Sequence, residues 1–305
     1  MRYTKYAFRV PEEKIIRVIT NTDAKNEADD QFAIVHAALS PKFENVGFIS
    51  AHYGVDRHTD SMERGYEELK RVFDKMQIDH TDLIFRGASC PMQTKEEIIP
   101  SEGASLIIEE AMKDDPRPLY VLFLGPITDL ASAYLQEPRI ANRLTAIWIG
   151  GAKYPAGGPE FNLKNDIHAA NVIFASQIPV WQIPQNVFER AVVSLAELEQ
   201  KVYWKGEIGR YLFEQLNEYA QEPEARNNSF RSGESWVLGD SPTIGVLLYE
   251  DRFEYDWVPA PLFGSDMQYI HTPLNRPIRV YRRIDSRLIL EDFFAKIALF
   301  AEASK

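Results

Sequence analysis

The sequence predicts an α/β protein with a Rossmann-like, open, mostly parallel sheet and helices on both faces. Short β-branched runs alternate with longer amphipathic runs up to about residue 190 of the 305. The expected strands are apolar almost throughout, which is typical of parallel strands covered on both faces. FLGPITDLASAYL passes from a strand through a Gly-Pro turn into a helix, as in one half of a βαβ unit.

Strand and helix patterns alternate in the order that this fold class requires. Strands are expected at residues 14–22, 44–52, 82–86, 119–124, 144–149 and 179–183. Helices are expected between them, at residues 29–39, 57–76, 101–113, 128–135 and 166–176. Parallel neighbours need long crossover connections, and helices of this length supply them.

The last third of the chain is mainly helical and closes with a strand pair and a helix. QEPEARNNSFRSGES is loop-like, and SPTIGVLLYE is typical of a helix with Pro early in its first turn. With no repeat or linker, we expect a single domain over residues 1–305, in which residues 204–240 form a cap or lid beside the site. The expected elements are helices at residues 194–202, 207–219, 241–250 and 286–303 and strands at residues 255–259 and 278–284.

The overall charge excludes two classes of partner. The formal net charge is −11 and the sequence pI is about 5.2. Nucleic-acid backbones and anionic membranes need basic patches, so we expect neither as a partner. Cys90 is the only cysteine, the N-terminal segment lacks the apolar core of a signal peptide, and no apolar run is long enough to span a bilayer. These features predict a cytoplasmic protein.

Carboxylates gather where the first expected strand ends. In RVITNTDAKNEADDQFAIVHAAL, Asp23, Glu27, Asp29 and Asp30 lie between that strand and the next helix. In an open parallel sheet, ligands bind beyond the carboxyl ends of the strands. Acidic residues also cap helices, and this would be enough to explain Asp29 or Asp30 taken alone.

A bound cation explains the acidic cluster as a whole. Carboxylates this close repel one another, and burying them unpaired is costly. Ca²⁺ or Mg²⁺ takes several oxygen ligands and cancels the repulsion. Zn²⁺ is less suitable, because the segment has no Cys or His at ligand spacing. A metal-free carboxylate pair that works as acid and base remains an alternative.

Polar residues follow other expected strands at the same edge of the sheet. LGPITDL contains Thr128 and Asp129, GGPEFNLKND contains Glu160 and Asn162, and WVLGDSPTIG contains Asp240. Taken singly, Asp129 and Asp240 would be helix caps and Asn162 a turn former. Their joint occurrence at one edge of a parallel sheet favours a binding site.

These segments resemble the inosine–uridine-preferring nucleoside hydrolases. NTDAKNEADDQFAIVHAAL, VLFLGPITDLASAY, IWIGGAKYPAGGPEFNLKNDIHAANVIF and GDSPTIGVLL occur in the order found in that family, between about residues 14 and 250. The first and third segments are specific, whereas GPITDL and GDSPTIGVLL would be weak alone. The resemblance implies the nucleoside hydrolase fold, a tightly bound Ca²⁺ and hydrolysis of the N-glycosidic bond of a ribonucleoside or a related ribosyl compound.

The resemblance also implies roles for individual residues. Asp23 would be the general base that deprotonates a calcium-bound water, and nearby carboxylates would stabilise the oxocarbenium-like sugar left when the base departs. The residues implied to hold the ribose hydroxyls are Asp29, Glu160 and Asn162. The implied calcium ligands are Asp23, Asp30, the backbone carbonyl of Thr128, and Asp240.

The chain departs from the family pattern around the opening motif and the leaving group. The usual Asp-x-Asp-x-Gly-x-Asp-Asp begins here with Asn21, lacks the Gly and has two extra residues before Asp29. Gly239 replaces a His that assists departure of the base in many members, and Val55 stands where the family often has an Asn that touches ribose. His52, at the end of the second expected strand, could replace the missing acid, although a lone His there is more often structural.

Two other functions remain open. A homologue that binds ribose or a nucleoside but has lost turnover would explain Gly239 and Val55. A Mg²⁺-dependent phosphohydrolase would also place acids at a strand end, but the chain has no Gly-rich phosphate loop. The expected partner is a small nucleoside or ribosyl substrate, and analogy with the family suggests a homodimer or homotetramer.

Overall fold

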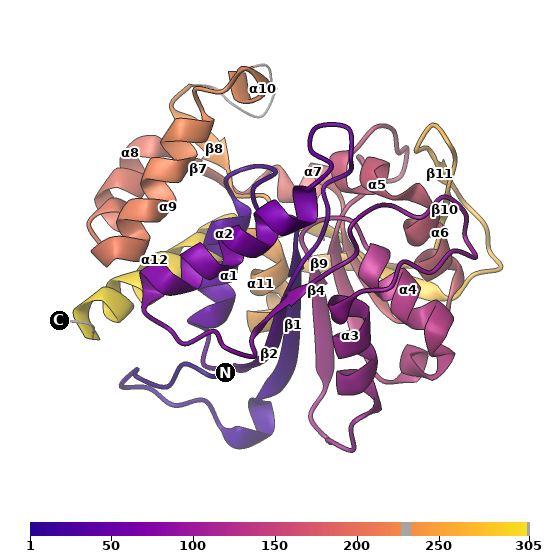
Figure 1. Ribbon diagram of the computed structural model, residues 1–305, viewed down its shortest axis with the longest axis horizontal. Coiled ribbons are helices and arrows are strands. Elements are labelled where there is room, and N and C mark those ends of the chain that lie inside the picture. The colour runs from indigo at the N-terminus through magenta and orange to yellow at the C-terminus, as the bar shows by residue number, and fades with distance from the viewer. Residues whose placement is uncertain (227–232, 304–305) are drawn as a thin grey trace.

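One sheet collects strands from both ends of the chain. The structure is a computed structural model that describes residues 1–226 and 233–303. Its eight-stranded sheet has the order β3-β2-β1-β4-β5-β6-β12-β9 (Figure 1), and all neighbours are parallel except β9 and β12. The strands are β1 Ile16–Thr22, β2 Phe43–Ser50, β3 Ile84–Arg86, β4 Leu119–Phe123, β5 Thr145–Ile149, β6 Val180–Ile183, β9 Glu254–Pro259 and β12 Pro277–Arg283.

Strand β1 lies in the middle of the sheet, and its end is where a ligand site is expected. All of its residues are buried, and it pairs with β2 on one side and β4 on the other. The strand order reverses between β1 and β4, so the connections from these strands leave toward opposite faces. Such a switch point opens a crevice beyond the carboxyl ends of the strands.

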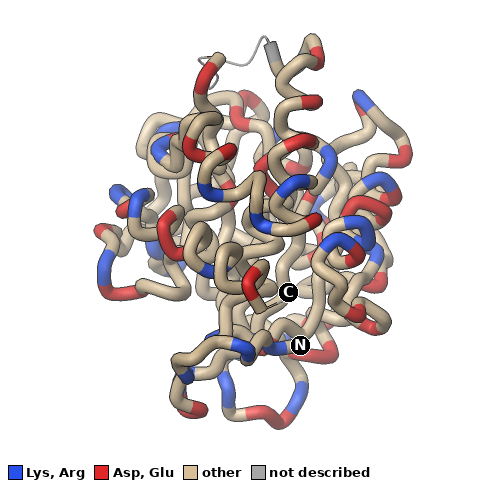
Figure 2. Tube along the Cα trace, turned by 90° about the vertical axis from the view of Figure 1, so that its left-hand side faces the viewer, with Lys and Arg blue, Asp and Glu red and all other residues tan. Residues whose placement is uncertain are grey.

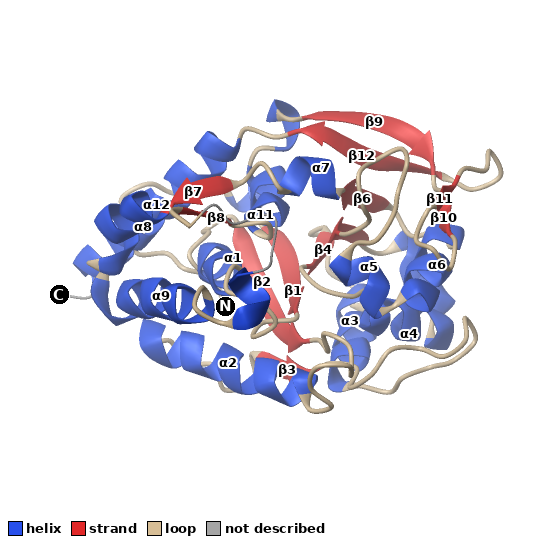
Figure 3. Cartoon of the chain, turned by 90° about the horizontal axis from the view of Figure 1, so that it is seen from above, coloured by secondary structure: helices blue, strands red, loops and turns tan. Residues whose placement is uncertain are grey.

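Helices cover both faces of the sheet, which confirms the predicted fold class (Figure 3). Neighbouring strand residues alternate between two cores: Val18 and Leu122 belong to one, and Ile19 and Val121 to the other. The first core is covered by α1 Asp30–Ala38, α2 Ser61–Met76, α11 Ser241–Leu248 and α12 Ser286–Ala303. The second is covered by α3 Glu102–Met112, α4 Thr128–Gln136 and α6 Ile167–Ala175.

A helical layer stands outside α2 and α12, and it includes most of the predicted lid, residues 204–240 (Figure 1). The expected helices at residues 194–202 and 207–219 are present, the first as a short α-helix that continues into a π-helical turn. The expected loop at residues 221–235 includes a short helix, and its residues 227–232 lie outside the described residues. The elements of this layer are β7 Val192–Ser194, α8 Leu195–Leu198, η3 Glu199–Tyr203, α9 Gly206–Tyr219, α10 Pro223–Arg226 and β8 Ser235–Val237.

The remaining elements are short and were not predicted. They include two helices of four or five residues that border the switch point, α5 and α7, and a small strand pair, β10 and β11. Their bounds are α5 Phe161–Asn165, α7 Gln185–Phe188, β10 Leu262–Phe263, β11 Tyr269–Ile270, η1 Glu12–Lys14, η2 Pro138–Asn142 and η4 Glu250–Arg252.

The surface carries both signs of charge. Figure 2 shows acidic and basic residues interspersed over the side in view, without a continuous basic stripe of the kind that a nucleic-acid backbone would need. Each helix in residues 1–226 and 233–303 is too short or too polar to cross a bilayer.

Candidate active site

A cavity of about 350 Å³ opens beyond the carboxyl ends of β1, β4 and β5. Residues that directly follow or end these strands, such as Leu124 and Ile149, form part of its wall. Thr128 and His52 are not among the described residues that line it. The residues that sequence reasoning assigned to the site and that line the cavity are Asp23, Asp29, Asp30, Glu160, Asn162 and Asp240.

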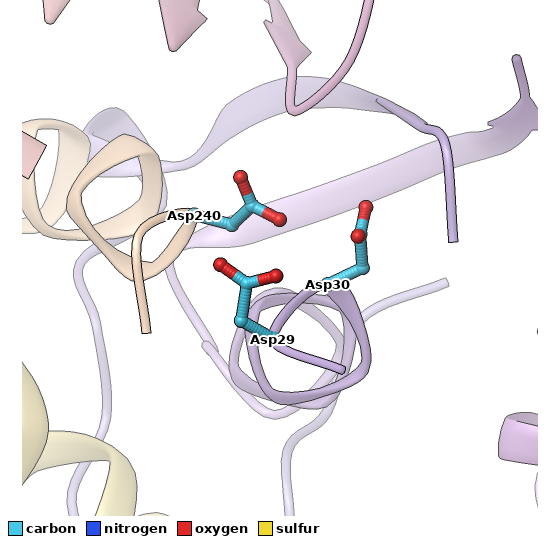
Figure 4. Close-up of side chains that lie close together, drawn as sticks. All are labelled: Asp29, Asp30 and Asp240. Atoms are coloured by element: carbon cyan, nitrogen blue, oxygen red, sulfur yellow. The ribbon is translucent and has the colours of Figure 1, made fainter. Parts of the chain in front are cut away.

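Three carboxylates from two helix starts converge in this cavity. Oxygen atoms of Asp29, Asp30 and Asp240 lie within 4.8 Å of one another, and all three side chains are buried. Figure 4 shows them pointing toward a common space, with Asp29 and Asp30 at the start of α1 and Asp240 just before α11. This arrangement suits a hard cation, which binds several carboxylate oxygens at once.

Helix capping does not account for these acids. Asp29 and Asp240 hold the N-cap positions of α1 and α11, yet neither side chain makes a cap hydrogen bond. Instead, the Gly239 backbone N–H donates to Asp29, and the Thr22 hydroxyl donates to Asp30. The carboxylates are therefore held in position with oxygen atoms left for a ligand.

Burial and mutual repulsion raise the pKa values of the cluster. Burial contributes most for each of Asp23, Asp29 and Asp240, and neighbouring carboxylates add to the rise. Burial also raises the pKa of Asp30 to about 7, against an opposing effect of the hydrogen bond from Thr22. Near neutral pH the cluster must hold either protons or a cation.

The stability of the metal-free protein should therefore fall as pH rises. The raised pKa of Asp30 means that its contribution to stability is fully present below about pH 4, where the carboxyl is protonated in the folded and the unfolded chain, and is lost as pH rises through about 7. We expect Tm in the presence of a chelator to be several degrees lower at pH 8 than at pH 5.5. Added calcium should remove most of that difference, because it replaces the protons. Thermal denaturation at both pH values tests this, and an unchanged Tm with calcium at pH 8 would contradict it.

Asp23 follows β1 and enters the same cavity from the sheet. Its Oδ2 atom is buried and has no hydrogen-bond partner in the described residues, as expected of a group that awaits a ligand. The carboxylate lies against Gly125, where a Cβ atom would approach the Asp23 Cγ to 2.6 Å. Glycine at position 125 therefore leaves room for Asp23 at the switch point.

Glu160 and Asn162 line the cavity from the start of α5. Three backbone N–H groups donate to the Glu160 carboxylate, those of Gly151 at 2.8 Å, Leu163 at 2.9 Å and Asn162 at 3.0 Å. The Asn162 Nδ2 donates to the Leu124 carbonyl at 2.7 Å and to the Ile149 carbonyl at 2.9 Å. Both side chains are thus fixed by the ends of neighbouring strands.

The structure does not bring His52 to the cavity. The Gly54 N–H donates to its Nδ1 at 3.1 Å, so Nε2 carries the hydrogen and donates to the Thr128 hydroxyl at 2.9 Å. That hydroxyl donates to Asp166 at 2.7 Å. Burial lowers the pKa of His52 to about 4, which leaves a neutral ring. Both ring nitrogens serve the fold, and we therefore withdraw His52 as the replacement acid.

Thr128 keeps its predicted place at the start of α4. Its hydroxyl is fixed between His52 and Asp166, which holds the first residue of that helix in a defined position. The predicted calcium ligand is the Thr128 carbonyl rather than this hydroxyl, and the assignment stays a prediction.

Asp129 is part of the scaffold and does not line the cavity. It accepts hydrogen bonds from the Asn21 Nδ2 at 2.8 Å, the Ala88 N–H at 2.8 Å and the Ser101 hydroxyl at 2.6 Å. It is therefore neither the cap nor the ligand that the sequence suggested. Asn21 stands where the family motif has Asp, and its amide supplies the donor that a second carboxylate could not.

Replacing Asn21 with Asp should destabilise the protein by roughly 2–3 kcal/mol, because it puts two buried carboxylates face to face. The double variant Asn21→Asp/Asp129→Asn restores an amide–carboxylate pair with its polarity reversed, and should recover part of the loss. Urea denaturation of the single and double variants measures both effects. Wild-type stability of Asn21→Asp would contradict the assignment.

Other features of the cavity were missed or left open. Asn26 and Glu27 are half-buried and line it, as do Arg57, Phe188 and Tyr219. Such contacts join distant segments, and no local pattern in the sequence marks them. The Gly missing from the opening motif is compensated by Lys25, which itself adopts a left-handed φ of 79°.

An open α/β sheet with a carboxylate-lined cavity at its switch point defines a ligand-binding protein of the doubly wound class. Comparison with known proteins identifies its family. A profile described as inosine-uridine preferring nucleoside hydrolase matches residues 18–280. The chain belongs to this family, which is a family of N-ribohydrolases, and the predicted resemblance is confirmed.

Individual relatives agree in sequence and in fold. The probable uridine nucleosidase 1 of Oryza sativa subsp. japonica is 23% identical over 258 residues, which cover 82% of this chain and 73% of that protein. The inosine-uridine preferring nucleoside hydrolase of Crithidia fasciculata is 24% identical over 135 residues, 43% of each chain. The purine-preferring ribonucleoside hydrolase from Gardnerella vaginalis superposes with a TM-score of 0.77 at 18% identity, covering 94% of this chain and 99% of that one.

Proposed function

We propose that the protein is a calcium-dependent N-ribohydrolase that cleaves the bond between a base and ribose. The observation that carries this proposal is the convergence of Asp29, Asp30 and Asp240 in a cavity at the switch point of a family member. The Asp29 and Asp240 side chains make no cap hydrogen bonds, and Asp23 Oδ2 has no partner among the described residues. These oxygen atoms are therefore available to bind a cation.

The donor set favours a hard cation such as calcium over Zn²⁺. Its side-chain donors are all carboxylate oxygens, which suit a hard cation and not Zn²⁺. The residues that would hold the ion are Asp23, Asp30, the Thr128 carbonyl and Asp240. When bound, calcium would supply the positive charge that orients water and a vicinal diol and lowers the pKa of that water.

Side chains of the protein would transfer the proton, bind the ribose and stabilise the charge that develops on it. Asp23 would take a proton from the attacking water, and its raised pKa in the metal-free state reflects how strongly this cavity resists uncompensated charge. Asp29, Glu160 and Asn162 would accept hydrogen bonds from ribose hydroxyls. Carboxylates close to the sugar would stabilise positive charge at C1 as the base departs.

Release of free ribose from nucleosides tests the proposal directly. Calcium-loaded protein is incubated with purine and pyrimidine ribonucleosides, and reducing sugar is measured. We expect release that Asp23→Ala abolishes and Asp56→Ala leaves intact, because the side chain of Asp56 is 80% exposed and does not line the cavity. No release above that of Asp23→Ala from any nucleoside would refute the proposed activity.

A binding protein without turnover is the second candidate. It is favoured by Gly239 at the position of the family's His and by the engagement of both nitrogens of His52 within the protein. Titration calorimetry with ribose and nucleosides separates the two. Binding without product supports this candidate, and any product excludes it.

A further inference from the structure

A cationic side chain, Arg57, lines the cavity together with the carboxylates. Among the described residues that form its wall, Arg57 is the only Lys, Arg or His. We propose that Arg57 binds an anionic oxygen group of the substrate, and that the preferred substrates are ribosyl compounds with a 5′-phosphate. This inference rests on the proposed N-ribohydrolase function and names the substrate class for the same site.

Arg57 forms no ion pair with the described residues, so its charge is available to a ligand. Its guanidinium lies 5.7 Å from the ring centroid of Tyr53 and 5.2 Å from that of Phe161, and it donates to Asn26 Oδ1. These contacts fix the group over two aromatic faces. Within residues 1–226 and 233–303 it has no carboxylate partner, whereas Arg64 in the same region pairs with Asp60 at 3.0 Å.

The contacts of Arg57 place it on one flank of the cavity. Phe161 directly follows Glu160, so the cation stands beside a residue proposed to hold a sugar hydroxyl. On the surface nearby, Asp56 and Lys164 form a solvent-exposed ion pair at 3.4 Å, outside the lining of the cavity. Arg57 thus belongs to the end of the cavity formed by the loop after β2 and the start of α5.

Two further aromatic residues of the cavity wall come from other elements and suit a base. Phe188 from α7 lies close to Gly239, where an added Cβ atom would meet its ring at 3.3 Å, and Tyr219 from α9 lines the same cavity. In ribose, C1 and C4 stand on either side of the diol carbons, so the base and the 5′ group leave in different directions. With the diol on the carboxylate cluster and the base against Phe188 and Tyr219, the proposal places the 5′ group at Arg57.

The charge of the cavity allows an anion at this flank. Arg57 is exposed at the rim, where water and salt screen the buried carboxylates. A divalent cation on the cluster would cancel part of their charge. The planar guanidinium presents paired N–H donors that match two oxygen atoms of a phosphate. A single carbonyl or hydroxyl of an uncharged substrate would accept fewer of these hydrogen bonds.

The test compares substrates that differ only in the phosphate. We would measure kcat/KM of the calcium-loaded protein for uridine and inosine and for their 5′-monophosphates. Wild type should prefer the monophosphates, and Arg57→Ala should reduce the monophosphate-to-nucleoside ratio by about 10- to 100-fold, mainly through KM. Arg57→Lys keeps the charge without the fork and should fall between the two. Lys164→Ala, which removes a nearby cation outside the lining, should leave the ratio unchanged.

A binding measurement keeps the inference separate from turnover. In calorimetry with calcium present, ribose 5-phosphate should bind more tightly than ribose, and Arg57→Ala should remove the difference. Ribose 5-phosphate carries no base, so its binding reports on the 5′ group alone. A nucleoside with a carboxylate on its base is measured beside it. If Arg57→Ala weakens the binding of that nucleoside only, the 5′ assignment is overturned. Equal binding of the two sugars, or an equal loss in Arg57→Ala for nucleosides and monophosphates, would overturn the proposal. If no N-glycosidic bond is cleaved, the proposed function fails while the calorimetry still decides the role of Arg57.

Discussion

Replacing Asp23 with Asn should lower kcat by about 1,000-fold or more, because the change removes the proposed general base, which is also a proposed charged calcium ligand. The substitution keeps the size of the side chain, and we expect the variant to fold because of the surroundings of residue 23. The Asp23 carboxyl is buried beside other carboxylates that raise its pKa, so a neutral amide relieves repulsion. Rates of ribose release over a range of calcium concentrations measure the loss.

Stability measurements show whether the loss is catalytic. Without metal, Asp23→Asn should have a Tm equal to or above that of wild type, whereas added calcium should raise its Tm less than that of wild type. Asp56→Asn serves as the matched control, since this exposed acid lies outside the cavity. A variant with near-normal kcat would exclude Asp23 as the base.

Removing calcium is expected to have an effect of similar size. A chelator should reduce hydrolysis to background, because the buried carboxylates would otherwise repel one another and bind protons in place of the sugar and water. Calcium should restore the rate fully. Magnesium should restore less, since it is smaller and gives up its water ligands reluctantly.

Metal content and activity must be followed in the same sample. Elemental analysis before and after chelation, with the rate measured at defined free calcium, relates occupancy to turnover. Full activity in protein shown to be free of metal would remove calcium from the mechanism and return the carboxylates to the metal-free acid–base alternative.

The sequence predicted the sheet well because burial on both faces leaves a strong pattern. The observed strands β1 to β6 begin and end within two residues of their predicted bounds. Helix α2 begins at Ser61 rather than at the expected residue 57, because the polar run before it forms part of a loop at the cavity. Helices α5 and α7, of five and four residues, are too short to show a period.

The site was predictable where residues follow strands in a fixed order. Asp23 and Glu160 could be placed together because parallel strands present their carboxyl ends at one edge. Asp240 begins α11 after a strand of a separate antiparallel pair, so its place came from the family resemblance. Arg57 could not be placed, since its position depends on contacts with Phe161, more than one hundred positions along the chain. The orientation of His52 depends likewise on Thr128 and Asp166, which no spacing reveals.

The hydrogen bonds that fix Asn162 also determine the polarity of recognition. Because both of its amide hydrogens are engaged by main-chain carbonyls, only its oxygen can face a guest molecule, and the nearby carboxylates are acceptors too. At this position the ligand must therefore supply the hydrogen. A sugar whose contacted hydroxyl is methylated or absent would leave desolvated oxygen lone pairs facing carbon. Its affinity should therefore fall far more than its small change in shape would suggest.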